Sequence, residues 1–281
     1  MSSANKHDLL FSDITTKENL LSFLKEQGKK HAAFLHYTDL DTLNKMLEKG
    51  KIHLSRADTL NDFLEGGQCA DNEMVFIGSF SYGLTENIAM WSMYAFPYNR
   101  AVRLRITKNT MLDFVDSFNV SPHIYKTNGE EISYAKKPKL TIANVVYENS
   151  CSYFHPASKV GKTLLKSNLV SEKNGNAFQN SVLNWCIKKA IWKSENEVRL
   201  ILKLGESLSD PSIKKIAIDF SKALHKISVT CGPCVDAKEE RNALKKFGKF
   251  PVVKSEYYNG TFFKSCNAKC NGTPFCKERK K

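Results

Sequence analysis

Short runs in which apolar and polar residues alternate, as in strands, are interspersed along the chain with stretches whose apolar residues recur at helical spacing. Residues 40–49 are typical of an amphipathic helix that Thr38 or Asp39 caps and Gly50 ends. Other helices are predicted at 17–28, 86–96, 178–192 and 236–247, and at 111–118 behind an Asn109 cap. Strands are predicted at 32–38, 51–55, 74–82, 100–107, 141–147, 197–202, 213–220, 227–231, 251–253 and 261–263.

These elements interleave irregularly, without the steady strand–helix rhythm of a doubly wound sheet. The pattern therefore predicts an α+β fold, a single domain with a mixed, largely antiparallel sheet flanked by helices. Within it, residues 1–30 supply an N-terminal helix packed on the main domain, and residues 31–250 form that domain. Residues 251–281 supply the last strands and a basic, cysteine-containing tail. A hydrophobic share of 42% is enough for a sizeable core.

One stretch, residues 192–202, carries chemistry within this pattern. If Glu197 starts a strand, Glu197 and Arg199 point to one side and the alternating Val and Leu residues to the other. Glu195 then shares the side of Glu197. Two close carboxylates raise one another's pKa and an arginine lowers both, so the stretch can hold a tuned acid or base. The alternative is a strand start with a solvated acidic edge and one ion pair.

The cysteines allow two further interpretations. Cys231-Gly232-Pro233-Cys234 has the residue pattern of a redox-active dithiol, but a turn at the end of a strand is favoured because the following chain is too short for a thioredoxin-like domain. With Cys266, Cys270 and Cys276 the same pair could bind zinc, although the distal spacing is irregular. The zinc alternative stays open, and no metal ligand is assigned.

The charge favours anionic partners. Lys and Arg exceed Asp and Glu by 13, and residues 136–173 and the tail 264–281 each carry a net charge of +5. Such surfaces suit a nucleotide or a nucleic acid. Neither a signal-peptide core nor an apolar run of membrane-spanning length occurs in the chain, so a cytoplasmic location and no membrane partner are expected. The oligomeric state is left open.

Several motifs together resemble the bacterial domain-of-unknown-function family 2971. The resemblance covers most of residues 31–250, with Phe63 where that family usually has proline and Met93 where histidine is common. The matching motifs are Leu35-His36-Tyr37-Thr38, Ile52-His53-Leu54-Ser55, Phe63-Leu64-Glu65, Met90-Trp91-Ser92-Met93-Tyr94-Ala95, Trp192 with Glu195-x-Glu197-x-Arg199, and the Gly232-Pro233 turn.

A weaker resemblance links the opening strand, helix and strand to ADP-ribosyltransferase-like domains. It implies NAD as substrate and cleavage of the nicotinamide–ribose bond, with Glu197 beside the nicotinamide ribose and Glu195 as the first carboxylate of a Glu-x-Glu pair. His36 would hold the adenosine-side ribose and serve the catalytic site. The other nucleotide-binding residues that the resemblance implies are Tyr37, Thr38, Trp91, Tyr94 and Tyr82.

Three functions therefore compete. The first is an NAD-dependent ADP-ribosyltransferase or NAD glycohydrolase, such as a bacterial toxin or phage-defence factor. The second is a non-catalytic nucleic-acid-binding module that uses the basic segments 136–173 and 264–281. The third is a metal-dependent nuclease built on Glu65, Glu195 and Glu197, because clustered carboxylates bind Mg²⁺. Convergence of His36, Tyr94 and Glu197 on one cleft would favour the first.

Overall fold

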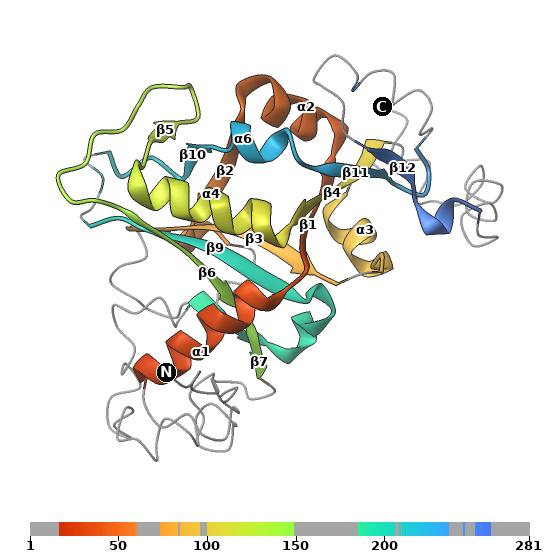
Figure 1. The fold of residues 1–281 in the computed structure, drawn as a ribbon, viewed down its shortest axis with the longest axis horizontal. Coiled ribbons are helices and arrows are strands. Elements are labelled where there is room, and N and C mark those ends of the chain that lie inside the picture. Colours follow the sequence, from red (N-terminus) through yellow and green to blue (C-terminus); the bar gives the residue numbers. More distant parts are fainter. Residues whose placement is uncertain are drawn as a thin grey trace, which may run out of the picture.

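The computed structural model describes residues 17–60, 74–83, 85–95, 100–148, 185–205, 208, 210–235, 244 and 251–259 (Figure 1). Several predicted features lie outside these ranges: Phe63 and Glu65, most of the basic segment 136–173, the helix expected at 236–247 except for residue 244, the strand expected at 261–263 and the tail with its three cysteines. The division of the chain at residues 30 and 250 stays a prediction.

A ten-stranded mixed sheet forms the centre of the fold, in the strand order β12-β11-β4-β1-β3-β2-β10-β5, with β9 paired to β3 and β6 paired to β9. Within the described sheet, β11 and β12 pair in parallel and the other pairs are antiparallel. This confirms the predicted fold class. The strands are β1 (Ala33–Asp39), β2 (Lys51–Arg56), β3 (Val75–Tyr82), β4 (Ala101–Thr107), β5 (Ile124–Lys126), β6 (Lys139–Asn144), β9 (Glu197–Lys203), β10 (Lys215–Asp219), β11 (Ser228–Cys231) and β12 (Val252–Lys254).

Helices flank this sheet, and a separate parallel pair of strands, β7 (Val146–Glu148) and β8 (Ile187–Lys189), lies beside it (Figure 1). None of the described helices combines the length and the apolar character needed to cross a bilayer. The α-helices are α1 (Lys17–Lys30), α2 (Leu40–Lys49), α3 (Ile88–Tyr94), α4 (Lys108–Val120) and α6 (Ser221–Leu224), and the 3₁₀ helices are η2 (Ala57–Thr59), η6 (Ala190–Glu195) and η8 (Glu256–Asn259).

The sequence explains the ends of α2. The Asp39 carboxylate accepts a hydrogen bond from the Thr42 backbone N–H at 2.9 Å, so Asp39 is the cap that the pattern allowed. Gly50 ends the helix at φ 62°, a left-handed conformation that glycine adopts without strain. Because α2 directly follows β1 and directly precedes β2, it connects the end of β1 to the start of β2.

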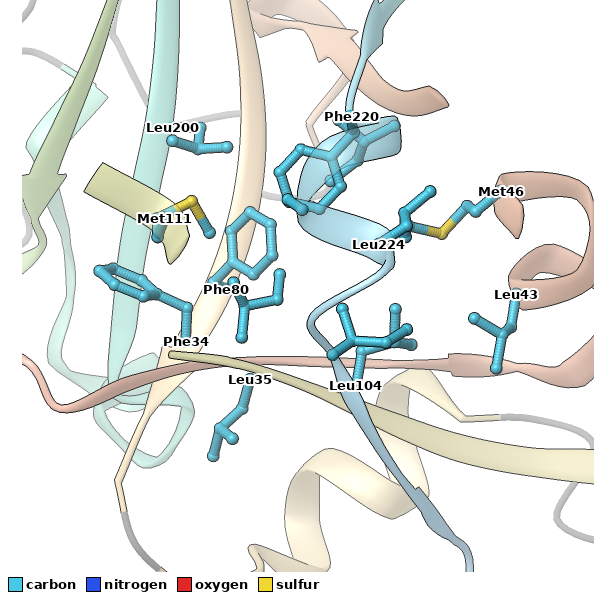
Figure 2. Packing of buried hydrophobic residues seen from close by; sticks show 14 of the residues in the cluster. Phe34, Leu35, Leu43, Met46, Phe80, Leu104, Met111, Leu200, Phe220 and Leu224 are labelled. Atoms are coloured by element: carbon cyan, nitrogen blue, oxygen red, sulfur yellow. The ribbon is translucent and has the colours of Figure 1, made fainter. Parts of the chain in front are cut away.

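The main core lies on the face of the sheet that carries α2, α4 and α6. In Figure 2, Phe34 and Phe80 point toward Met111 of α4, whereas Leu35 points to the opposite side of β1. Phe114 of α4 packs edge-on against Phe220, with ring centroids 4.5 Å apart. Apolar side chains thus fill the helix-covered face, and the residues that alternate with them point to the other face.

The sheet opens at β3. One edge of β3 pairs with β9 from Val75 to Ser81. The opposite edge pairs with β1 only through Ser81 and Tyr82, and with β2 only through Phe76 and Ile77. Between these two short contacts, residues 78–80 of β3 pair with neither β1 nor β2. The first two strands therefore diverge from a common neighbour and leave an opening in the sheet.

Two local predictions were wrong. Residues 178–192 were expected to form a helix, but the described part forms β8 and η6, because residues 146–148 pair with residues 187–189 in parallel. The cap of α4 is Thr107 and not Asn109, and its side chain accepts from the Thr110 N–H. Strand β4 forms where a strand was expected at 100–107, and Arg103 is buried in it.

Candidate active site

A cavity of about 270 Å³ occupies the opening between β1 and β2. This volume is just below the range for small-molecule sites, roughly 300–1,000 Å³, and so suits a ligand of about one nucleoside. Its wall combines two glutamates, a lysine, an arginine, histidines, serines and aromatic rings from segments far apart in the sequence. The polar and aromatic lining residues are His36, Tyr37, His53, Ser55, Thr59, Ser79, Phe80, Ser81, Tyr94, Lys188, Trp192, Glu195, Glu197 and Arg199.

The two carboxylates reach the cavity through a change of backbone conformation. Glu195 ends the 3₁₀ helix η6, Asn196 has φ 45° and ψ 57°, and Glu197 begins β9. The left-handed conformation is uncommon for a residue other than glycine, and here the Asn196 carbonyl accepts the Tyr82 N–H at 2.8 Å. Glu195 and Glu197 thus face one cavity because of this turn, and not because of strand alternation as the sequence suggested.

Four charged side chains form a compact network at this point. Lys188 Nζ lies 2.6 Å from Glu195 Oε2 and 3.3 Å from Glu197 Oε2. Arg199 donates two hydrogen bonds to Glu197, from Nε to Oε1 at 2.7 Å and from Nη2 to Oε2 at 3.0 Å. Each glutamate is 3% exposed, so the alternative of a solvated acidic strand edge is wrong. The formal charges within the network cancel.

This network decides the protonation of Glu197. Burial alone would raise the pKa of the carboxyl, but the Arg199 guanidinium and the Lys188 ammonium outweigh burial and lower the pKa to about 2. Glu197 is therefore a fixed negative charge at neutral pH and cannot act as a proton donor. Its backbone N–H donates to the Tyr147 hydroxyl at 2.8 Å, which ties the start of β9 to β7.

His36 lines the cavity from the side of β1. Its Nδ1 lies 3.2 Å from the carbonyl oxygen of Ser79, one of the β3 residues that pair with neither β1 nor β2. A carbonyl oxygen only accepts, so Nδ1 carries the proton and Nε2 is left as an acceptor. Burial lowers the pKa of His36 below its ordinary value, which keeps the ring neutral at pH 7. His36 can thus accept a hydrogen bond from a ligand hydroxyl.

Aromatic rings and one further hydrogen bond complete the site. Tyr94, on α3, donates its hydroxyl hydrogen to Glu195 Oε1. The Lys188 ammonium lies 4.9 Å from the centre of the Trp192 ring. Tyr37 packs edge-on against Trp91 and accepts the Asn87 N–H at the start of α3, and so holds that helix over the cavity.

The structure brings five of the sequence-assigned site residues to this cavity: His36, Tyr37, Tyr94, Glu195 and Glu197. The other three, Trp91, Tyr82 and Thr38, lie outside the lining of this cavity. Trp91 is 1% exposed and donates from Nε1 to Glu86 Oε2 at 2.9 Å, so it is part of the core. Tyr82 stacks on His31 with ring centroids 3.7 Å apart. Thr38 is buried in β1 opposite Val102.

Sequence reasoning assigned no binding role to Trp192 or Lys188. The position of Trp192 three residues before Glu195 was a usable signal, because a residue so close in the chain has to lie near the carboxylates. Lys188 carried no such signal, since its segment was expected to be an amphipathic helix. Only the pairing of β8 with β7 brings its ammonium to the glutamates.

The described residues give less support to the dithiol and metal interpretations. Cys231 ends β11 and is buried, and the Val235 N–H donates to the Gly232 carbonyl at 3.1 Å, which confirms a turn. Among the residues that the structure describes, no three His, Cys, Asp or Glu side chains are grouped to hold a metal ion. Because Cys266, Cys270 and Cys276 lie outside those residues, the zinc alternative is untested.

Comparison with known proteins adds one distant likeness. No protein-family model matches the chain, and no curated protein matches it. Among solved structures, the chain is similar to DarT from Thermus sp. 2.9, solved in complex with carba-NAD+. The TM-score is 0.34, the sequence identity 10%, and the match covers 82% of this chain and 97% of that chain. Membership in family 2971 therefore stays a prediction.

Proposed function

We propose that the cavity between β1 and β2 binds NAD and that the chain cleaves the nicotinamide–ribose bond, as an ADP-ribosyltransferase-like enzyme. The observation that supports this most directly is convergence. His36 on β1, Tyr94 on α3 and Glu197 on β9 line one cavity, although His36 and Tyr94 lie 58 residues apart in the chain and Tyr94 and Glu197 lie 103 apart. The resemblance in the sequence implied this arrangement for an NAD site.

The chemistry needs a negative charge next to the ribose. When nicotinamide leaves with the bonding electron pair, positive charge develops on the ribose as an oxocarbenium ion, and a fixed carboxylate stabilises it. Glu197 is ionised at every pH near neutrality, as its pKa of about 2 requires. Its bidentate bond to Arg199 holds it in one orientation, so it needs no reorganisation during the reaction.

Tyr94 and Trp192 supply the surfaces against which a flat ring can pack. Both line the cavity on the side of Glu195, and Trp192 is half-buried, so its indole is open to a ligand. The free acceptor Nε2 of His36 suits a ribose hydroxyl. Since the cavity fits about one nucleoside, we expect the nicotinamide riboside half of NAD to occupy it and the rest of the dinucleotide to extend from its mouth.

The test measures nicotinamide released from NAD by the purified chain, with water as acceptor. Wild-type protein is expected to release nicotinamide faster than a buffer blank, and Glu197→Gln to slow this release about a hundredfold, a typical cost of one lost electrostatic group. Glu131→Gln is the matched control, because Glu131 is exposed and pairs with His123 outside the cavity.

The proposal fails if wild-type protein does not release nicotinamide above the blank, or if Glu197→Gln matches it. Circular dichroism and the urea midpoint of each variant establish that it is folded. Because the Gln substitution leaves Arg199 and Lys188 less well paired, Trp192→Leu serves as a second variant. Trp192 is half-buried and its loss leaves the ion pairs in place, so a rise in KM for NAD is expected.

The described residues give less support to the two competing functions, a metal-dependent nuclease and a nucleic-acid-binding module. Glu195 and Glu197 already bind the cations of Lys188 and Arg199, so they do not form an open carboxylate site for Mg²⁺. The basic segments invoked for nucleic-acid binding lie largely outside the described residues. Nucleic acid as acceptor, a role in toxicity or defence and a cytoplasmic location all remain proposals.

A further inference from the structure

Lys188 places a positive charge inside the proposed NAD cavity. The side chain is 8% exposed and comes from β8, which belongs to the small two-stranded sheet and not to the main one. Its ammonium lies between the two carboxylates, 2.6 Å from Glu195 Oε2 and 3.3 Å from Glu197 Oε2. A cation thus occupies the part of the cavity in which the ribose–nicotinamide bond would lie.

The surroundings of this ammonium suit an organic cation. Two carboxylates supply negative charge, and the Trp192 ring, 4.9 Å away, supplies a face that attracts cations. We name this place, defined by Glu195, Glu197 and Trp192, the cation site. Aromatic rings combined with carboxylates also recognise ligands whose positive charge is spread over a flat ring or a quaternary nitrogen.

The two cations of the network differ in how firmly they are held. Arg199 bonds to Glu197 through two nitrogens and donates through Nη1 to the Trp185 carbonyl at 2.8 Å, behind the cavity. A planar guanidinium held in this way is fixed. Lys188 ends in a single ammonium on a flexible four-carbon chain, which can bind elsewhere once another cation arrives. Lys188 is therefore the exchangeable cation.

We propose that the cation site binds a planar cationic ring, an N-substituted pyridinium, and that Lys188 is the internal cation which this ring displaces. The inference rests on the proposed function, because the nicotinamide ring of NAD is such a pyridinium. Lys188 then determines specificity. When the Lys188 ammonium leaves, Glu195 and Glu197 lose a positive partner. A pyridinium replaces that positive charge and a neutral ring does not, so only cationic ligands exchange with the ammonium at a small cost in free energy.

The test compares two small ligands on the intact chain, by calorimetry or by Trp fluorescence. 1-Methylnicotinamide is a pyridinium cation, and nicotinamide is its neutral counterpart. A tethered competitor acts at a high effective concentration, so its removal strengthens binding of the ligand that competes with it. In Lys188→Met we expect at least about tenfold tighter binding of 1-methylnicotinamide, with nicotinamide affinity changed less than about twofold.

Lys188→Arg, which keeps the charge, is the matched control and is expected to bind 1-methylnicotinamide no more tightly than wild-type protein. If Lys188→Met does not fold, Trp192→Leu in the wild-type background is the second test. It is expected to weaken binding of 1-methylnicotinamide at least about fivefold more than binding of nicotinamide.

Equal affinity of wild-type and Lys188→Met for 1-methylnicotinamide would overturn the inference, and so would equal gains for both ligands. The readout is binding of a ligand that the chain does not cleave, so it is independent of turnover. A chain that binds the cation as expected but does not release nicotinamide from NAD would refute the proposed function and leave the cation site standing. A chain that releases nicotinamide from NAD, but whose Lys188→Met variant binds 1-methylnicotinamide no more tightly than wild-type protein, would refute only the role of Lys188.

Discussion

Arg199 Nε and Nη2 lie 2.7 and 3.0 Å from the two carboxylate oxygens of Glu197, and both side chains are almost completely buried. Replacing Arg199 by Met leaves a buried carboxylate with only Lys188 to balance it, and the Trp185 carbonyl loses its donor. We expect the free energy of unfolding to fall by about 3–5 kcal/mol, measured by urea denaturation.

Arg100→Met is the matched control for this ion pair. Arg100 pairs with Asp41 at the surface, where both side chains are largely exposed. Exposed pairs contribute about 0–1 kcal/mol, so the control should lose no more than that. A similar loss in both variants would show that the buried pair adds nothing beyond a surface contact.

The depressed pKa of Glu197 predicts how stability responds to acid. In the folded chain the pKa is about 2, and in the unfolded chain it returns to its ordinary value of about 4.3. At pH values between the two, the unfolded state binds more protons, so stability rises with pH. The contribution is complete above about pH 5 and is lost as pH falls toward 2.

Urea midpoints of wild-type protein and Glu197→Gln, measured at pH 7, 5 and 3.5, isolate this contribution, because all other titrating groups are shared. The wild-type midpoint should fall more steeply between pH 5 and 3.5 than that of the variant. Parallel curves would mean that the Glu197 carboxyl has the same pKa in both states.

Trp91 and Trp192 are expected to respond in opposite ways. Trp91 is 1% exposed in the core, so Trp91→Ala should destabilise the chain by about 3–5 kcal/mol. Trp192 is half-buried at the cavity, so Trp192→Leu should change stability by less than about 1 kcal/mol while ligand affinity falls. Urea denaturation and NAD binding by calorimetry separate the two effects. A stability loss confined to Trp192→Leu would contradict this placement.

The Gly232 turn tolerates no side chain. A Cβ at this position would lie 2.6 Å from the Ala101 Cβ and 3.0 Å from its carbonyl oxygen, and the Gly232 N–H donates to that same carbonyl at 2.8 Å. Gly232→Ala should therefore cost about 1–3 kcal/mol through displacement of backbone. Cys234→Ala, at a half-buried neighbour, serves as control. An unaffected melting temperature in Gly232→Ala would contradict the tight turn.

Local patterns predicted most of the described elements. Strand β9 alternates Val198 and Leu200 in the core with Glu197 and Arg199 on the other face, as periodicity requires. The helix after Asp39 began and ended where its cap and Gly50 indicated. These features depend on residues close in sequence, and for that reason one sequence is enough to find them.

The opening of the sheet could not be predicted in the same way. It depends on the register by which β1 and β2 share one edge of β3, and register is set by contacts across the whole fold. The same holds for Lys188, whose position follows from pairing between residues 146–148 and 187–189. The same holds for Trp91, because the sequence did not reveal that Glu86 holds its indole in the core.

A crystal structure with a non-hydrolysable NAD analogue tests the central claim most directly. The account predicts that the nicotinamide ring lies between Tyr94 and Trp192, that the adjoining ribose contacts Glu197, and that the Lys188 ammonium has left its place between the carboxylates. An analogue bound elsewhere, such as the second cavity between α4 and α6, would contradict the account, as would a chain that binds no analogue at all.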